Sequence, residues 1–273
     1  MTLKEAYLCC CDHLKNADID EADFKAMCVA CSVAGVKNSS YLINKNREFD
    51  FSGIERLLER LKSREPLQYV LGKWDFLDGE FYVGKGVLIP RPETEELVQL
   101  AVSYIKNLGE CIVYDLCAGS GCIGVSVARA CPSAKIFLVE KSSDACYYLK
   151  KNAQGISNAE IICDDINNTD GLPKADVIIS NPPYIKTDGL SSLEQEVLQE
   201  PIMALDGGTD GFDFYRIIND KWACMLEKDG ALFLEIGEAQ GEKIKTVLSN
   251  FTDVRVIKDL YNNDRIVTAR KNR

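Results

Sequence analysis

The sequence predicts an α/β protein with a mostly parallel sheet, preceded by a small domain built only of helices. From residue 111 onward, segments typical of strands alternate with helical segments, which is the pattern of βαβ units. Residues 1 to about 64 contain helical periodicity and no strand pattern. We therefore expect a helical domain over residues 1–70, a β-hairpin linker over residues 71–90 and an α/β domain over residues 91–273.

The N-terminal region has the spacing of amphipathic helices. Its clearest apolar stripe repeats at i, i+3, i+4 and i+7, which places the apolar side chains on one helical face. These positions are Ile54, Leu57, Leu58 and Leu61. Cys28 and Cys31 fall on a second stripe of this kind, so we interpret the pair as part of a core rather than as half of a zinc site.

The segment over residues 72–89 predicts the hairpin. Strand-forming side chains flank an Asp78-Gly79 pair, and Asp-Gly between such runs is a strong hairpin signal. The flanking residues are Trp74, Phe76, Phe81 and Tyr82. A helix is then expected to begin at Pro92, because proline suits the first helical turn and acidic residues follow it.

The remaining chain predicts the sheet. Strand patterns occupy residues 111–116, 135–140, 159–164, 175–180, 231–237 and 253–259. Helical runs separate most of these strands. In open sheets of this kind ligands bind beyond the carboxyl ends of the strands, so functional residues are expected in the loops that follow the strands.

Composition argues against several classes of function. The 273 residues include 32 Lys and Arg against 42 Asp and Glu, and a net charge of −10 does not provide the basic surface that tight nucleic-acid binding requires. The chain contains no uncharged apolar run of about 18 residues. Charges near the N-terminus argue against a signal peptide. We expect a cytoplasmic protein without a membrane span.

The cysteines and the single histidine are expected to be structural. In a cytoplasmic protein the twelve cysteines stay reduced, and we interpret nearly all of them as small core hydrophobes. His13 lies among helix-forming residues and is predicted on a helix surface. Neither a metal site nor histidine-based catalysis is expected.

A glycine-rich segment follows the first strand of the α/β domain. Gly119, Gly121 and Gly124 form a Gly-x-Gly-x-x-Gly motif that opens a helix over about residues 121–131. The glycines permit a tight turn and a close approach to a ligand, and the helix N-terminus offers free N–H groups. Alone the motif is weakly specific, because such glycines also simply let a helix pack on a strand.

Two carboxylates make the motif more specific. Glu140 ends the second strand 19 residues after Gly121, where it can accept both ribose hydroxyls; the alternative is a solvated carboxylate at a strand end. Asp115 directly precedes the loop, where it would repel a pyrophosphate and attract an ammonium group. It therefore favours S-adenosylmethionine over a dinucleotide. Asp165 and Ile166, after the third strand, fit a place beside the adenine and a purely structural place equally well.

The most specific signal is Asn181-Pro182-Pro183-Tyr184, directly after the strand over residues 175–180. Asn181 and Pro182 each precede a proline, and each proline fixes its own φ, so the loop is stiff. The alternative is a proline-rich turn that only ends a strand. As a functional loop it suits a planar –NH2 group, whose two hydrogens the Asn181 oxygen and the Pro182 carbonyl can accept while Tyr184 stacks on its plane. The nitrogen would then face an electrophilic methyl group, with catalysis by positioning and electrostatics.

With both motifs in place, the chain resembles the S-adenosylmethionine-dependent methyltransferases that carry Asn-Pro-Pro-Tyr, and most closely the release-factor glutamine methyltransferases of the HemK/PrmC family. The similar segments are residues 64–76, 87–98, 115–128, 178–185, 200–211, 232–241 and 258–270. The resemblance implies a Rossmann-like class I S-adenosylmethionine-dependent methyltransferase domain. It also implies methylation of the side-chain amide nitrogen (N5) of the glutamine in the Gly-Gly-Gln motif of peptide chain release factors.

The resemblance also assigns residues. It places five loop residues around the methionine part of the cofactor, namely Cys117, Ala118, Gly119, Ser120 and Gly121. It places Asp115 and Asn181 beside the cofactor, Glu140 on the ribose, and Asp165 and Ile166 by the adenine. It assigns the target glutamine to Asn181, Pro182, Pro183 and Tyr184. Cys117 stands where the family often has glycine, so we expect a changed affinity for the cofactor rather than a loss of binding.

The partners expected from this resemblance are release factors, which the helical domain would dock, with no nucleic acid, no membrane and a monomeric enzyme. A nucleic-acid (adenine amino) methyltransferase is the main rival, because an adenine –NH2 group presents the same local chemistry. An NAD-binding oxidoreductase would leave the Asn-Pro-Pro-Tyr loop unexplained. A cofactor-binding scaffold without catalysis would have no need of that loop.

Overall fold

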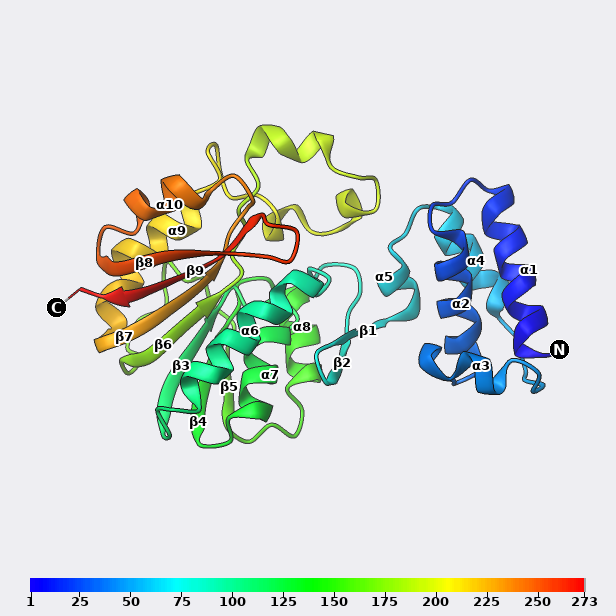
Figure 1. Ribbon diagram of the computed structural model, residues 1–273, viewed down its shortest axis with the longest axis horizontal. Coiled ribbons are helices and arrows are strands. Elements are labelled where there is room, and N and C mark those ends of the chain that lie inside the picture. Colours follow the sequence, from blue (N-terminus) through cyan, green and yellow to red (C-terminus); the bar gives the residue numbers. More distant parts are fainter. Residues whose placement is uncertain (273) are drawn as a thin grey trace. The chain divides into compact units, whose positions relative to one another are not determined.

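The computed structural model describes residues 1–272, which form two compact units (Figure 1). The helical unit comprises Met1–Lys73 together with the short segment Glu194–Gln199. The sheet unit comprises the rest of the chain from Trp74 onward. Each unit has its own hydrophobic core.

The helical unit contains five α-helices among its described residues, namely α1 (Leu3–Asn16), α2 (Ala22–Val33), α3 (Tyr41–Asn44), α4 (Ile54–Lys62) and α5 (Leu67–Leu71). A capping box starts α1, because the Thr2 hydroxyl accepts from the Glu5 N–H while the Glu5 carboxylate accepts from the Thr2 N–H. His13 is exposed on α1, as predicted. Lys25 is buried and pairs with Glu196, which ties the segment Glu194–Gln199 to this unit.

The sheet unit is an α/β structure that confirms the predicted fold class. Its first elements are β1 (Lys73–Phe76), β2 (Gly79–Tyr82), α6 (Pro92–Ile105), β3 (Cys111–Leu116), α7 (Cys122–Ala130), β4 (Ala134–Val139) and α8 (Ser143–Asn152). They are followed by β5 (Ala159–Ile162), β6 (Ala175–Ser180), α9 (Asp213–Ile217), β7 (Leu226–Glu235), α10 (Gly241–Val247), β8 (Phe251–Lys258) and β9 (Asp264–Lys271). Strands β1 and β2 form the predicted hairpin, and the others form one sheet in the order β5-β4-β3-β6-β7-β9-β8.

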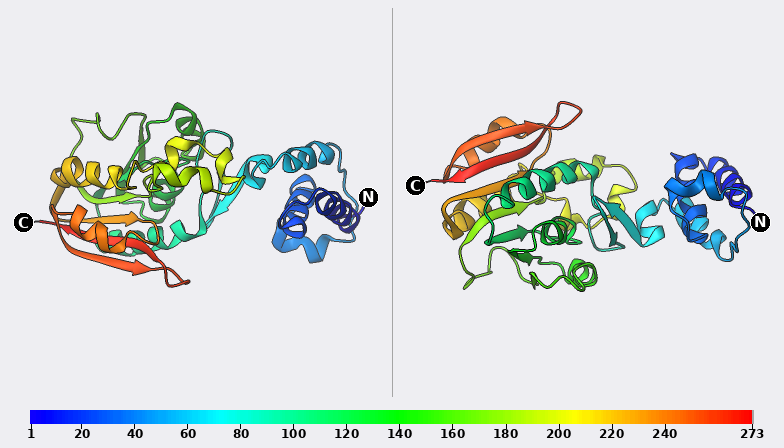
Figure 2. Two further views of the ribbon diagram at one scale, coloured as in Figure 1. Left: turned by 90° about the horizontal axis from the view of Figure 1, so that it is seen from above. Right: turned by 60° about the horizontal axis from the view of Figure 1, so that its bottom comes forward.

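Helices cover both faces of this sheet (Figures 1 and 2). On one face, α6, α7 and α8 bury residues such as Leu97, Val125 and Leu149 in a core that also takes Phe76 and Phe81 from the hairpin. On the other face, α9 and α10 contribute to a second core around Tyr114 and Trp222. Strands β5, β4, β3, β6 and β7 are parallel, so their carboxyl ends share one edge.

The strand predictions were right in the centre of the sheet and incomplete at its edge. The bounds of β3 and β6 agree with those expected. Strand β7 begins at Leu226, five residues before the expected start at position 231, because charged residues interrupt the apolar pattern there. Strand β9 was not predicted. It runs antiparallel between β7 and β8.

The interpretation of the cysteines needs two corrections. Cys146 and Cys163 are joined by a disulfide, so the expectation that all thiols are reduced is wrong for this pair. Cys9 and Cys224 are exposed rather than buried in a core. Within residues 1–272 no group of three or more His, Cys, Asp or Glu side chains is arranged to hold a metal ion.

No single helix between residues 1 and 272 is both long and apolar enough to cross a membrane. One bent pair, Ala22–Val33 with Asn38–Asn44, meets the length and composition criteria only when its two helices are taken together.

Candidate active site

The two sequence motifs meet at the point where the strand order reverses. Strands β3 and β6 are parallel neighbours, with Leu116 opposite Ser180. The Ser180 hydroxyl donates a hydrogen bond of 2.5 Å to the Leu116 carbonyl and holds the two strand ends together. Cys117 and Asn181, the next residues in each chain segment, therefore leave the sheet side by side. Such a reversal point is where open α/β sheets bind their ligands.

A pocket of about 1030 Å³, part of it open to solvent, lies at this point. Nine of the predicted site residues line it: Cys117, Ala118, Gly119, Ser120, Glu140, Asp165, Ile166, Asn181 and Pro183. The other four predicted residues, Asp115, Gly121, Pro182 and Tyr184, are not among the residues that line it. The structure thus brings the two motifs to one cavity within the sheet unit.

The glycine-rich loop is held in a left-handed turn. Gly121 has φ +81°, and a Cβ there would lie 2.4 Å from the Leu149 side chain, so both backbone conformation and space require glycine. Cys117 has φ +60°, a region in which glycine would be less strained. Asn152 braces the loop, because its side-chain amide donates to the carbonyls of Ser120 and Tyr82.

Asp115 is fully buried beneath this loop. Its Oδ2 accepts a 2.8 Å hydrogen bond from the Gly124 N–H, whereas its Oδ1 has no hydrogen-bond partner among the described residues. Burial raises the pKa of this carboxyl to about 8. A buried carboxylate oxygen without a partner is costly unless a cation or a proton meets it. Its environment therefore fits an ammonium group bound nearby.

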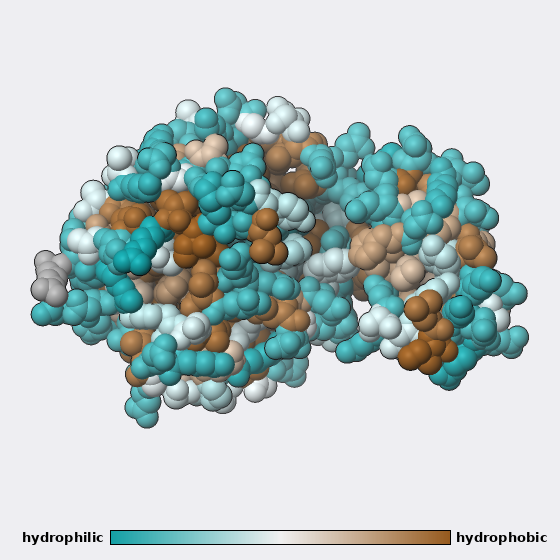
Figure 3. All heavy atoms as spheres, viewed as in Figure 1, coloured by the Kyte–Doolittle hydropathy of each residue, from teal (hydrophilic) through white to brown (hydrophobic). Residues whose placement is uncertain are grey.

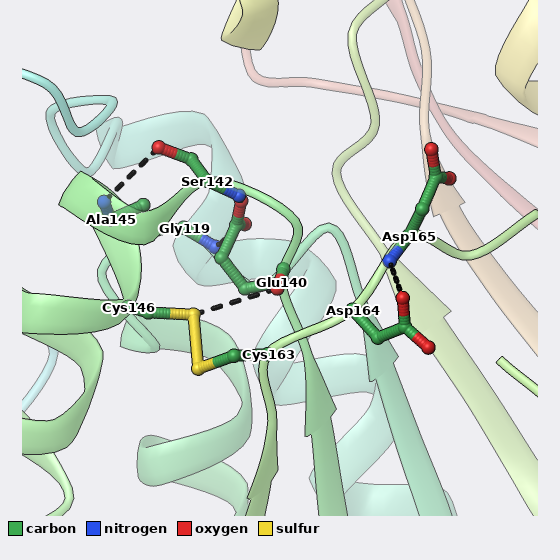
Figure 4. Close-up of a disulfide and its surroundings, with 8 residues drawn as sticks. All are labelled: Gly119, Glu140, Ser142, Ala145, Cys146, Cys163, Asp164 and Asp165. Carbon is green, nitrogen blue, oxygen red and sulfur yellow. Dashed lines mark hydrogen bonds between the residues drawn. A yellow bond between two sulfur atoms is a disulfide. The ribbon is translucent and has the colours of Figure 1, made fainter. Parts of the chain in front are cut away.

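Glu140 is buried at the end of β4 rather than solvated (Figure 4). Its two carboxylate oxygens accept hydrogen bonds of 2.8 Å from the Gly119 N–H and 2.7 Å from the Ser142 N–H. Burial raises its pKa, and these backbone donors act against that shift. Each oxygen keeps a second lone pair, so the carboxylate can still accept from a diol in the pocket. The Cys146–Cys163 disulfide lies beside it and joins α8 to the segment after β5 (Figure 4).

Asp165 and Ile166 lie on the pocket wall after β5. Burial tends to raise the pKa of Asp165, but hydrogen bonds from Lys141, at 2.8 Å, and from Asn167 lower it overall. Ile166 is buried, and its carbonyl accepts from the Trp222 indole N–H at 3.0 Å. The pair therefore presents a fixed anion beside an apolar side chain.

The Asn181–Tyr184 loop is supported from behind by two further residues. Gly207 approaches it so closely that a Cβ there would lie 2.7 Å from the Tyr184 Cα and 2.8 Å from the Pro183 carbonyl oxygen. Gln240 donates a hydrogen bond of 3.1 Å to the Tyr184 carbonyl. The loop is therefore rigid both from its own prolines and from its neighbours.

Two residues outside the predicted set connect to the ends of this loop. The Asn181 side-chain amide donates to the Thr94 hydroxyl at 3.2 Å, and that hydroxyl donates to Glu235 Oε2 at 2.6 Å. The other oxygen of Glu235 accepts from the Tyr184 hydroxyl at 3.4 Å. Glu235 is buried, which raises its pKa to about 7.

A fourth buried carboxylate, Glu200, anchors the segment before α6. It accepts a 2.9 Å hydrogen bond from the Ile89 N–H and pairs with the Arg91 guanidinium. Glu200 thereby ties residues 87–91 to the segment that follows it, and both line the pocket, the second through Pro201, Met203 and Ala204.

Sequence reasoning missed Thr94, Glu200, Gly207, Glu235 and Gln240 as supports of the site. All five lie in segments whose similarity to a known family was already visible, so that similarity was the only available signal. Their partners are far away in the chain: the hydrogen bond between Thr94 and Glu235 spans 141 positions. No local pattern identifies such a pair.

Comparison with known proteins agrees with this architecture. Residues 97–210 match the family model of the Methyltransferase small domain, and residues 5–72 match that of the PrmC N-terminal domain. A ribosomal protein L11 methylase from Lactobacillus delbrueckii subsp. bulgaricus shares the fold, with a TM-score of 0.50 at 16% identity over 70% of this chain and 83% of that one.

Curated relatives cover the chain more fully. The Release factor glutamine methyltransferase of Thermodesulfovibrio yellowstonii is 39% identical over 228 residues, which is 81% of each chain. The protein of the same name from Clostridium acetobutylicum is 33% identical over 283 aligned positions, which span 98% of each chain. The chain belongs to the family of release factor glutamine methyltransferases.

Proposed function

We propose that this protein transfers a methyl group from S-adenosylmethionine to the side-chain amide nitrogen of a glutamine, the one in the Gly-Gly-Gln motif of peptide chain release factors. The observation that carries the proposal is the pocket itself, in which the stiff Asn181–Tyr184 loop faces the glycine-rich loop across the ends of β3 and β6. The names of the relatives supply the substrate class.

The pocket residues fit this cofactor. Glu140 would hold the ribose, Asp165 and Ile166 the adenine, and the loop from Cys117 to Gly121 the methionine part, with Asp115 beneath it. When bound, S-adenosylmethionine supplies an electrophilic methyl group on a sulfonium. The apolar wall and the buried carboxylates suit a ligand that carries both an aromatic base and positive charge.

The Asn181–Tyr184 loop positions the nucleophile. The Asn181 side-chain oxygen and the Pro182 carbonyl, neither of which has a hydrogen-bond partner within residues 1–272, would accept the two hydrogens of the glutamine amide. Tyr184 would pack on the amide plane. Because both acceptors are held rigidly, the nitrogen is oriented toward the methyl group without a reorganisation cost during the reaction.

The direct test is methyl transfer from labelled S-adenosylmethionine to a purified release factor. A release factor whose Gly-Gly-Gln glutamine is changed serves as the matched control, with DNA and RNA as parallel acceptors. We expect label on the unaltered factor alone. Label on nucleic acid would agree with the proposed role of the Asn181–Tyr184 loop. It would contradict a release factor as the substrate and favour an adenine amino methyltransferase.

Glu140→Ala is expected to weaken S-adenosylmethionine binding about tenfold or more, because a charged acceptor for the ribose is lost. Calorimetric titration of the cofactor measures this. Lys135→Ala is the control, since Lys135 is exposed on the same strand and lies outside the pocket lining. An unchanged affinity in the Glu140 variant would remove this residue from the cofactor site.

We further propose that the helical unit docks the release factor. Leu42 and Ile43 on α3 are 73% and 84% exposed, so this unit presents apolar side chains at its surface (Figure 3). The combined change Leu42→Ser with Ile43→Ser should raise the KM for the release factor about fivefold and leave kcat unchanged. Leu108→Ser, at an exposed apolar position in the sheet unit, is the control. An unchanged KM would contradict docking at this face.

The remaining expectations complete the proposal. The enzyme would act in the cytoplasm, as a monomer, on a protein and not on nucleic acid. The net charge of −10 supports the last of these, because phosphate backbones are bound by basic surfaces.

A further inference from the structure

The orientation of the Asn181 amide is decided by two buried residues behind it. An asparagine side chain can present either its oxygen or its –NH2 group to a ligand, and only the oxygen can accept hydrogens from a substrate amide. The neighbours of Asn181 therefore determine which kind of substrate group the pocket accepts.

Those neighbours form a chain of hydrogen bonds in which each group donates to the next, from Asn181 through Thr94 to Glu235. Glu235 ends β7 beside Asn181, because Leu234 is in register with Ser180 in the adjacent strand. As a carboxylate, Glu235 can only accept, so the Thr94 hydroxyl must donate its single hydrogen to it, at 2.6 Å. The oxygen of Thr94 is then left as an acceptor, and the Asn181 –NH2 group donates to it at 3.2 Å. The Asn181 oxygen is left facing the pocket that Asn181 lines.

From this geometry we propose that Glu235 and Thr94 are positioning residues that hold the Asn181 amide with its oxygen toward the substrate, and so select a nitrogen that donates hydrogen bonds. This rests on the proposed function of Asn181 and extends it to Thr94, which lies on the pocket wall, and to Glu235, which lies outside the pocket lining; both act through Asn181. Thr94 is 2% exposed and Glu235 is 1% exposed, so water does not compete for these hydrogen bonds.

Protonation of Glu235 allows the direction of these hydrogen bonds to reverse. A protonated Glu235 can donate to the Thr94 oxygen, which frees the Thr94 hydrogen to donate toward Asn181. The amide then turns its oxygen to Thr94 and its –NH2 group to the pocket, where it repels the substrate –NH2 group. The orienting effect is therefore present at high pH and is lost as pH falls through the pKa of Glu235, about 7.

Several other groups face Glu235 and affect this titration. Arg265 from β9 lowers the pKa, and Glu93 from α6 raises it. Thr94 and the Tyr184 hydroxyl stabilise the carboxylate by hydrogen bonds. The Tyr215 hydroxyl from α9 donates to the Glu235 backbone carbonyl rather than to its carboxylate.

The test is Thr94→Val, which keeps the shape of the side chain and removes the hydroxyl. We expect kcat on a purified release factor to fall about 10- to 30-fold, the scale of one lost orienting hydrogen bond. Affinity for S-adenosylhomocysteine, measured by titration, should stay within about twofold, because the cofactor residues are untouched. Thr94→Ser restores the hydroxyl and should recover most of the lost rate. Thr246→Val, at an exposed threonine of α10, is the matched control.

A second variant keeps the test decisive if Thr94→Val folds poorly. The kcat of the wild type should fall about tenfold per unit as pH drops below about 7, whereas Glu235→Gln, which cannot titrate, should show no such fall. A merely structural role would not remove this limb of the pH profile. An unchanged pH profile in Glu235→Gln, or a folded Thr94→Val enzyme with wild-type kcat, would overturn the proposed positioning role of Glu235 and Thr94. Failure of the wild type to methylate the release factor would instead overturn the proposed function.

Discussion

Replacing Asn181 by alanine is expected to lower kcat for methyl transfer about 10²- to 10³-fold while leaving cofactor binding nearly intact. The change removes one of the two acceptors proposed to hold the substrate –NH2 group, and loss of one preorganised polar partner lowers a rate by this order. The proposed cofactor contacts, to the glycine-rich loop and to Glu140, would remain, because these residues follow other strands. The expected signature is therefore a large change in kcat with little change in the affinity for S-adenosylmethionine.

The control for this variant is Asn107→Ala, at an exposed asparagine just after α6 whose side-chain amide donates to the Ser103 carbonyl of that helix. Single-turnover rates with saturating release factor measure the chemical step for both variants. A rate for Asn181→Ala within about threefold of the wild type would contradict its role in positioning the nitrogen.

Asp115→Asn is expected to weaken S-adenosylmethionine binding about 100-fold and to make the cofactor-free protein more stable at alkaline pH. The loss of affinity follows because the cofactor ammonium would lose the one buried carboxylate oxygen that has no partner among residues 1–272. The gain in stability has the same origin, because an ionised, half-satisfied carboxylate beneath the loop is replaced by a neutral amide.

The direction of the pKa shift of Asp115 determines how the stability of the folded protein changes with pH. The pKa of Asp115 rises from 3.8 to about 8 on folding, so the folded protein holds a proton that the unfolded chain has released. The contribution of the Asp115 carboxyl to the free energy of unfolding is fully present below about pH 4, and it is lost as pH rises toward 8. The melting temperature of Asp115→Asn should therefore exceed that of the wild type at pH 8.5, and the difference should shrink at pH 5.5. Equal differences at both pH values would mean that Asp115 does not titrate in this range.

The sequence predicted those features that local chemistry determines. Apolar runs marked β3 and β6, Asp78-Gly79 marked the hairpin, and the glycine-rich and proline-rich motifs marked the two loops of the pocket. The rule that ligands bind beyond the strand ends was then enough to locate the site from the order of the residues alone. These signals are local, because each depends on fewer than about ten consecutive residues.

The rest depends on which segments the sheet brings together. Strand β9 lies between its partners β7 and β8, and the Thr94–Glu235 hydrogen bond depends on the packing of α6 against β7. Gly207 is required by its contact with the backbone of Tyr184 rather than by a turn of its own, since it does not have a positive φ. The disulfide between Cys146 and Cys163 likewise requires a helix and a strand end to meet, which no spacing of cysteines predicts.

The prolines of the catalytic loop have a consequence for how its motion can be observed. Pro182 and Pro183 have no amide hydrogen, so hydrogen–deuterium exchange cannot follow the centre of the loop. Its neighbours can serve as reporters: the Ile185 N–H donates to the Leu205 carbonyl and the Gly207 N–H donates to the Ile185 carbonyl, at 2.9 and 2.7 Å. Separation of the loop from its support breaks both bonds. Deuterium uptake at these two amides therefore measures how often the Asn181–Tyr184 loop opens, although the loop's own prolines give no signal.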